Sequence, residues 1–169
     1  MKPGDHPEFF RLPPPPGASR ESTIRLDEEG SFWHDGELVT KDSLVRALHS
    51  WVSFHPDDGR PILTNGYDWT YFAVDDTPYF VELVRGRPPE PPTLVLSDGA
   101  EEPLDATTLV ADDAGVCFVR VKRGRCWARF WRHAQAALEP YLAADEPPRV
   151  VFGGGEFPIG RRSAAASSP

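Results

Sequence analysis

Three short turns containing glycine constrain the fold of this chain more than any other feature. Asp35-Gly36 and Asn65-Gly66 each separate two runs of β-compatible residues, and Arg123-Gly124 separates two more with a weaker turn signal. Two-residue hairpin turns require positive φ angles, which Asp, Asn and Gly adopt with little strain. The sequence therefore predicts three antiparallel β-hairpins centred on these dipeptides.

The first hairpin turn also fixes a register and leads into a helix. With this turn, His34 pairs with Glu37 and Trp33 pairs with Leu38. A helix is predicted from residue 41 to about residue 53. Its apolar residues form one stripe at helical spacing, namely Leu44, Val45, Leu48, Trp51 and Val52.

The second half of the chain repeats the order of the first. Each half reads as an acidic turn ending in glycine, a strand, a tight turn, a strand and a helix, and the turn glycines are Gly30 and Gly115. The second helix is predicted over about residues 131–142, where Pro140 should end it early. We interpret this order as a diverged internal duplication. The predicted fold class is α+β, with two repeated motifs, each an antiparallel sheet of hairpins plus one packing helix, joined by a Pro-rich linker.

Proline marks the predicted borders. Six of the 19 prolines lie within the first 16 residues, where Pro13–Pro16 favour extended polyproline II structure. A second cluster, within residues 88–92, is incompatible with a helix interior or a central strand. We interpret the N-terminal segment as a loosely held tail, and the alternative is a docking segment for a proline-reading module. The predicted divisions are a disordered Pro-rich tail at residues 1–20, a first α+β repeat at 21–87, a second α+β repeat at 93–160 and a disordered tail at 161–169.

Composition narrows the class of protein. The 169 residues carry 18 Lys and Arg against 26 Asp and Glu, and the net charge of −8 argues against a general nucleic-acid binder. No apolar run reaches the ~20 residues of a membrane span, and the N-terminal segment lacks the apolar core of a signal peptide. We therefore expect a cytoplasmic protein that does not span a membrane and reads no specific nucleic-acid sequence.

Several stretches of the sequence together resemble a known family. They match in order and spacing over roughly residues 21–160, and the stretches are Gly30–Gly36, Tyr67–Phe80, Phe118–Gly124, Ala128–Phe130 and Gly154–Gly160. The chain resembles the bacterial family catalogued as domain of unknown function 1285 (DUF1285). It departs from that pattern in its Pro-rich insert and its N-terminal tail. The resemblance implies an α+β protein of two repeated motifs, with a suggested role in signalling, and it implies no reaction and no functional residues.

The titratable residues form no catalytic or metal-binding pattern. None of the five histidines shares a ligand spacing with another, and the three Asp-Asp pairs lie in turns. His34 is expected to form a cross-strand ion pair with Glu37. Cys117 and Cys126 lack a catalytic signature and are expected to be small core residues. We therefore predict no catalytic residue, no metal and no cofactor.

One hairpin is unusually basic. Residues 120–132 hold six of the 18 basic residues and no acid. The register set by Arg123-Gly124 puts an apolar set on one face, namely Cys117, Val119, Val121, Cys126, Ala128 and Phe130. The opposite face then carries the candidate binding residues, namely Phe118, Arg120, Lys122, Arg125, Trp127 and Arg129. Arg120 sits opposite Trp127, which suits a guanidinium stacked on an aromatic ring.

The sequence leaves three interpretations open, two for the basic face and one for the histidines. The basic face could dock an acidic protein, a phosphate-bearing ligand or an anionic lipid surface in a non-enzymatic binding or signalling module. The other interpretation is a solvated sheet face, as most surface charge runs are. The alternative is a small-ligand binding protein or an enzyme with a site between the two repeats, where His34, His49 or His133 would meet a carboxylate.

Overall fold

The computed structural model describes residues 1–163, and the chain divides into two compact units, Met1–Asp75 and Asp76–Pro169. The sequence predicted a border at the proline cluster of residues 88–92, whereas the contacts divide the chain after Asp75. The strand Tyr79–Arg85 causes the difference, because it pairs with Cys126–Phe130 of the second unit. We call the two parts unit 1 and unit 2.

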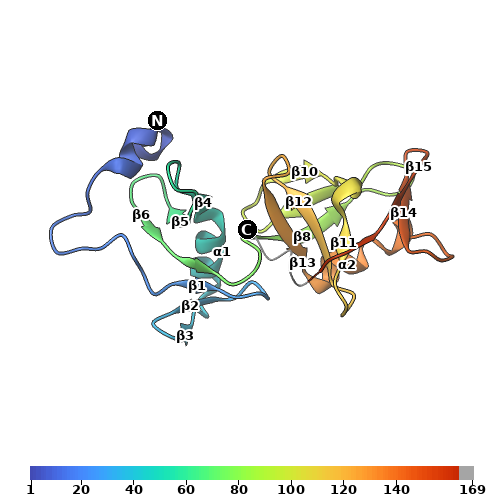
Figure 1. Ribbon diagram of the computed structural model, residues 1–169, viewed down its shortest axis with the longest axis horizontal. Coiled ribbons are helices and arrows are strands. Elements are labelled where there is room, and N and C mark those ends of the chain that lie inside the picture. Colours follow the sequence, from blue (N-terminus) through green and yellow to red (C-terminus); the bar gives the residue numbers. More distant parts are fainter. Residues whose placement is uncertain (164–169) are drawn as a thin grey trace. The chain divides into compact units, whose positions relative to one another are not determined.

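Unit 1 is built from short strands and one helix (Figure 1). Its strands form a four-stranded sheet in the order β3-β2-β1-β7 and a three-stranded sheet in the order β4-β5-β6. The elements are η1 (Pro3–Asp5), η2 (Pro7–Arg11), β1 (Arg25–Leu26), β2 (Phe32–His34), β3 (Glu37–Leu38), α1 (Asp42–Trp51), β4 (Val52–Phe54), β5 (Pro61–Thr64), β6 (Trp69–Tyr71) and β7 (Ala73–Val74).

The two predicted hairpins of unit 1 differ in outcome. β2 and β3 have the predicted register, with Asp35 and Gly36 at φ 52° and 78°. The second hairpin is wider than predicted, because β5 and β6 pair Thr64 with Trp69 and leave a four-residue loop. The Asn65 side chain accepts hydrogen bonds from the backbone N–H groups of the two residues that end this loop, which favours an Asx turn over a two-residue turn.

Unit 2 is organised around one large sheet. Its seven strands lie in the order β10-β9-β8-β13-β12-β11-β16, and β14 and β15 form a separate hairpin. The elements are β8 (Tyr79–Arg85), β9 (Thr93–Leu96), β10 (Glu101–Pro103), η3 (Ala106–Thr108), β11 (Val110–Ala111), β12 (Cys117–Val121), β13 (Cys126–Phe130), α2 (Arg132–Ala136), η4 (Glu139–Tyr141), β14 (Arg149–Phe152), β15 (Gly155–Pro158) and β16 (Gly160–Arg161).

The α+β class is confirmed, but the sheets are not purely antiparallel. β1 pairs with β7, β11 with β16 and β13 with β8 in parallel. These pairs join segments far apart in the sequence, which turn signals cannot predict. The second helix is also shorter than predicted: α2 ends at Ala136, and the chain then forms a 3₁₀ turn with Pro140. Proline has no N–H for a helical hydrogen bond, so the helix does not continue through it.

The predicted core face of the β12–β13 hairpin is confirmed. β12 and β13 pair Val121 with Cys126 and Val119 with Ala128, as the turn register requires. All six residues of the apolar set are buried, and α2 packs on the neighbouring strand β8. No helix among residues 1–163 is long and apolar enough to cross a membrane.

The described residues of both predicted tails make specific contacts. The N-terminal 20 residues contain η1 and η2 and hydrogen-bond to unit 1. At the other end, Gly160–Arg161 form β16 and Arg162 joins an ion pair, while residues 164–169 of the predicted tail lie outside the described residues. Composition predicted disorder in both segments, and among the described residues Phe10, Arg11 and Arg162 make the contacts that hold the chain.

Candidate functional site

The outer face of β12–β13 carries a partly exposed arginine and tryptophan pair. Arg120 and Trp127 are cross-strand partners, and the Arg120 guanidinium lies 4.2 Å from the centroid of the Trp127 ring. Both side chains are half-buried. A stacked guanidinium keeps its N–H edge available for a carboxylate, and within residues 1–163 no acidic side chain pairs with Arg120.

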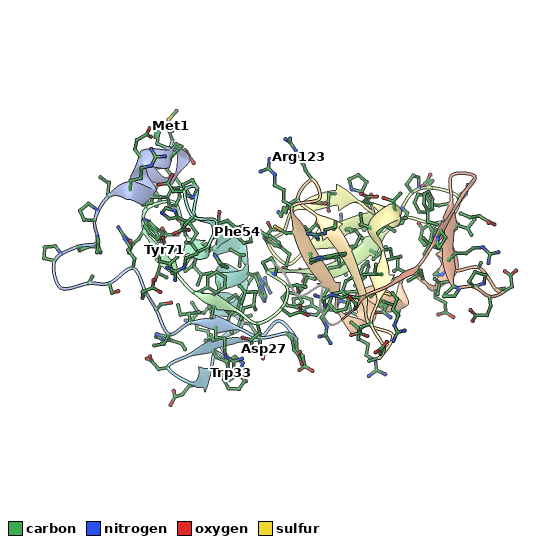
Figure 2. All side chains as sticks on the ribbon, in the orientation of Figure 1. Met1, Asp27, Trp33, Phe54, Tyr71 and Arg123 are labelled. Carbon is green, nitrogen blue, oxygen red and sulfur yellow. The ribbon has the colours of Figure 1, made fainter. Side chains whose placement is uncertain are left out.

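The turn of this hairpin adds two more exposed arginines. Arg123 and Arg125 are solvent-exposed, and Figure 2 shows Arg123 extending away from the tip of the hairpin. Arg125 follows the turn, and its backbone N–H donates to the Lys122 carbonyl oxygen at 3.3 Å. We call Arg120, Arg123, Arg125 and Trp127 the arginine–tryptophan surface.

Lys122 leaves the face on which the sequence register placed it. Lys122, Arg123 and Gly124 all have positive φ, so the alternation of the strand ends at Val121. The Lys122 ammonium pairs with Asp98 and lies 4.8 Å from the centroid of the Tyr79 ring. Its side chain therefore anchors the turn to unit 2 and is not part of the arginine–tryptophan surface.

Phe118 is also removed from the exposed face. It is 1% exposed, and the Arg162 guanidinium covers its ring at 3.8 Å, with Arg129 at 5.9 Å from the same centroid. Arg162 is itself held by Asp76 through two hydrogen bonds of 2.9 and 2.6 Å. The sequence offered no local signal for this contact, because Asp76 and Arg162 come from opposite ends of unit 2.

The two cysteines are buried and free. Burial raises the pKa of the Cys117 thiol to about 11. Burial also raises the pKa of the Cys126 thiol, although the positive charges of Lys122, Arg120 and Arg125 act in the opposite direction. Both thiols are therefore protonated at neutral pH, and neither is activated as a nucleophile.

The histidines occupy different surroundings. His34 is exposed and lies 3.6 Å from the carboxylate of its neighbour Asp35, although the predicted backbone register with Glu37 is present. A ring nitrogen of buried His49 lies 3.1 Å from the Gly30 carbonyl oxygen. Throughout residues 1–163, no three His, Cys, Asp or Glu side chains are grouped to hold a metal ion.

A concave site lies in the Pro-rich insert of unit 2. It has a volume of about 390 Å³ and is lined by Gly86, Arg87, Pro88, Pro89 and Glu90. None of the histidines and none of the candidate binding residues of the basic hairpin lines it. The insert therefore offers no support for a site built from the histidines.

Comparison with known proteins identifies two solved structures of the same architecture. The chain is 17% identical to a DUF1285 family protein from Silicibacter pomeroyi DSS-3, with 83% of this chain and 81% of that chain covered and a TM-score of 0.60. It is 16% identical to a DUF1285 family protein from Shewanella baltica OS155, with 70% and 91% covered and a TM-score of 0.51. No family model and no curated protein matches the chain. The chain therefore has the fold of these DUF1285 proteins, as its sequence motifs predicted.

Proposed function

We propose that the protein is a non-enzymatic binding module that docks an acidic segment of a partner protein on the arginine–tryptophan surface. One observation carries the proposal: Arg120 is stacked on Trp127 without an acidic partner in residues 1–163, and the exposed Arg125 follows on the same hairpin. Salt-bridged arginines elsewhere in unit 2, such as Arg85 and Arg161, have acidic partners within the unit. An unpaired set on one hairpin is therefore available to a partner.

The layout of these side chains favours an extended acidic segment over a small phosphate ligand. Arg120 and Trp127 lie opposite each other on adjacent strands, and Arg125 lies in the turn, one residue before β13, so the three side chains are spread along the hairpin. A small phosphate site usually gathers several donors around one anion. Carboxylates spaced along a peptide can each meet one guanidinium edge. Exposed ion pairs contribute only about 0–1 kcal/mol each, so we expect weak, salt-sensitive binding.

We also propose that the two units are diverged copies of one motif. In unit 1, the Asp27 carboxylate accepts hydrogen bonds from the backbone N–H groups of Glu29 and Ser31. In unit 2, the Asp112 carboxylate accepts the same two bonds from the residues at the same spacing. Each turn leads into a hairpin and a helix, and in each unit the last strand pairs in parallel with the strand that directly precedes the turn, β7 with β1 and β16 with β11.

A polar helix residue makes the same contact in both units. A ring nitrogen of His49 in α1 lies 3.1 Å from the Gly30 carbonyl oxygen. In α2, the Gln135 side-chain N–H donates to the Gly115 carbonyl oxygen at 2.7 Å. If the units are copies, the basic hairpin of unit 2 corresponds to the short β2–β3 hairpin of unit 1. The arginine–tryptophan surface is then a specialisation of the second copy.

Charge reversal tests the proposed surface. The variant R120E/R125E is compared with wild type and with R46E, which reverses an exposed arginine on α1 of unit 1. The probe is a fluorescent poly-glutamate peptide, and a phosphoserine peptide and vesicles of anionic lipid serve as the other arms. We expect R120E/R125E to weaken binding of poly-glutamate at least about tenfold, and R46E to leave it unchanged.

Two results would refute the proposal. Equal binding of poly-glutamate to wild type and R120E/R125E would show that this surface does not select acidic peptide. Binding of phosphoserine peptide or lipid in preference to poly-glutamate would assign the surface to another class of partner. We place the protein in the cytoplasm, which suits two cysteines that are buried and free.

A further inference from the structure

Residues 1–19 form a strap that is anchored to the rest of unit 1 at two places. The next residue, Arg20, is bound to β6, because its carbonyl oxygen accepts the Tyr71 backbone N–H at 2.7 Å and its guanidinium lies 4.5 Å from the centroid of the Trp69 ring. The first anchor joins η1 to the loop between β5 and β6. The Gly4 backbone N–H donates to the Gly66 carbonyl oxygen at 2.8 Å, and the Lys2 ammonium lies 5.5 Å from the centroid of the Tyr67 ring. The second anchor is Phe10-Arg11, at the end of η2. The strap is therefore held without joining either sheet of unit 1.

At the second anchor, unit 1 contacts three different groups of Phe10 and Arg11. The Phe10 ring packs against Trp69 and His55, with centroid distances of 5.9 and 6.1 Å. The Asp57 backbone N–H donates to Nδ1 of His55, so Nε2 is the ring nitrogen that donates to the Phe10 carbonyl oxygen at 3.1 Å. Arg11 forms two hydrogen bonds of 2.9 and 3.0 Å with the Asp57 carboxylate. The Phe10 ring, the Phe10 carbonyl oxygen and the Arg11 guanidinium thus each have a partner of fitting chemistry, namely Trp69, His55 and Asp57.

The strap can detach without breaking a sheet. Residues 12–19 hydrogen-bond only to neighbouring residues, within the strap or to Glu21, and Figure 1 shows this segment as an open arc between η2 and β1. The arc ends in a turn that the Ala18 N–H closes onto the Pro15 carbonyl oxygen. The Arg11–Asp57 pair is 55% and 45% exposed, so water competes for it.

We infer that His55, Asp57 and Trp69 form a docking site for a partner protein segment in which an aromatic residue is followed by arginine, and that the chain's own Phe10-Arg11 fills this site as an internal competitor. The site and the arginine–tryptophan surface lie in different units, so this inference does not depend on the proposed function. A short tether holds an internal ligand at an effective concentration in the mM range, so a partner must displace the strap to bind.

The test uses the full chain with its internal ligand weakened. The variant F10A/R11A is compared with wild type for binding of a fluorescent peptide, Gly-Ser-Gly-Phe-Arg-Gly-Ser-Gly, by fluorescence anisotropy. We expect F10A/R11A to bind this peptide at least about tenfold more tightly than wild type. The added change D57N should abolish that gain, and a peptide with Ala-Ala in place of Phe-Arg should not bind.

Matched controls separate docking from misfolding. Circular dichroism checks each variant, and the single change R11Q, which keeps the Phe10 ring in place, should give a smaller gain than F10A/R11A. Equal binding of the peptide by folded F10A/R11A and wild type would overturn the inference. So would a requirement for the whole strap sequence, because that result would assign the site to a second copy of this chain.

Discussion

The hairpins β2–β3 and β12–β13 arise from the same local chemistry and lie in different environments. Each follows an Asx turn, and each has the register that its turn dipeptide predicts. β3 is an edge strand of a four-stranded sheet, whereas β12 and β13 are interior strands of a seven-stranded sheet. Side chains of β2–β3 can remain half-exposed. On both faces of β12–β13, each side chain is buried, paired with another side chain of unit 2 or available to a partner protein.

The two hairpins differ in the burial of one aromatic residue at the same position. Trp33 and Phe118 both lie three residues after the turn glycine, and both have an arginine over the ring. Trp33 is half-exposed, and Arg25 is 5.5 Å from its centroid. Phe118 is fully buried, and Arg162 covers it at 3.8 Å. An aromatic ring at the same position after the turn glycine is therefore half-exposed in unit 1 and part of the core in unit 2.

The largest expected difference comes from truncating these two rings. Phe118→Ala should lower the free energy of unfolding by about 3–5 kcal/mol, because it removes a buried ring and leaves a cavity. Trp33→Ala should lower it less, since that ring is half-exposed and its main polar contact is the hydrogen bond from Nε1 to Asp27 (Figure 2). Urea unfolding followed by circular dichroism measures both. A larger loss for Trp33→Ala would contradict the comparison.

Replacing the arginine above each ring should also destabilise the protein more in unit 2 than in unit 1. Arg162 and Asp76 are 9% and 16% exposed, whereas Arg25 and Asp75 are 43% and 38% exposed. Arg162→Met leaves a nearly buried carboxylate without its partner, and we expect a loss of about 3 kcal/mol. Arg25→Met removes a solvent-screened pair and should cost about 0–1 kcal/mol. Equal urea unfolding midpoints for the two variants would show that the Arg162–Asp76 pair stabilises the protein no more than the Arg25–Asp75 pair.

The basic charges of the β12–β13 hairpin should not activate its cysteines. The pKa of Cys117 is raised to about 11, above the ordinary value of 9.0, because burial disfavours the thiolate. Below pH 9 the thiol is protonated in both the folded and the unfolded chain, so this group does not change stability. Between pH 9 and 11 only the unfolded chain loses the proton, so stability should fall as pH rises, by about 2–3 kcal/mol in total from this group.

Thiol labelling checks this prediction directly. Iodoacetamide should modify the native chain slowly at pH 8 and the urea-unfolded chain rapidly at the same pH. The variant C117S reports Cys126 alone, whose pKa is also raised by burial. Rapid labelling of native protein at pH 8 would show that the arginines of this hairpin outweigh burial.

The sequence predicted features that local chemistry determines. Asp35-Gly36 determined the register of the first hairpin, and Arg123-Gly124 led to the correct pairing of Val121 with Cys126. The alternation of buried and outward residues along β12 and β13 followed from that pairing. These predictions needed only neighbouring residues, so they were confirmed.

Features that depend on distant residues were missed. Asp76 and Arg162 are 86 residues apart, and no pattern in the sequence links them. The parallel pairing of β8 with β13 and the docking of Phe10 on Trp69 are likewise long-range contacts. Lys122 was misplaced for a local reason, since its positive φ ends the alternation of the strand one residue early. Of the six predicted residues, Phe118 lies in the core, Lys122 anchors the turn and Arg129 lies beside the Phe118 ring. The surface keeps Arg120, Arg125 and Trp127 and gains Arg123.

The smallest expected effect concerns the stacks themselves. A double-mutant cycle with Arg120→Ala and Trp127→Ala should give a coupling energy of about 0.5–1 kcal/mol, because the guanidinium lies 4.2 Å from the ring on a partly exposed face. The matching cycle with Arg25→Ala and Trp33→Ala should give less, since that guanidinium is 5.5 Å away and is paired with Asp75. Unfolding in urea gives both values. A coupling near zero for Arg120 and Trp127 would mean that the arginine is not pre-positioned by the ring, and the surface would then have to order its arginines when an acidic partner binds.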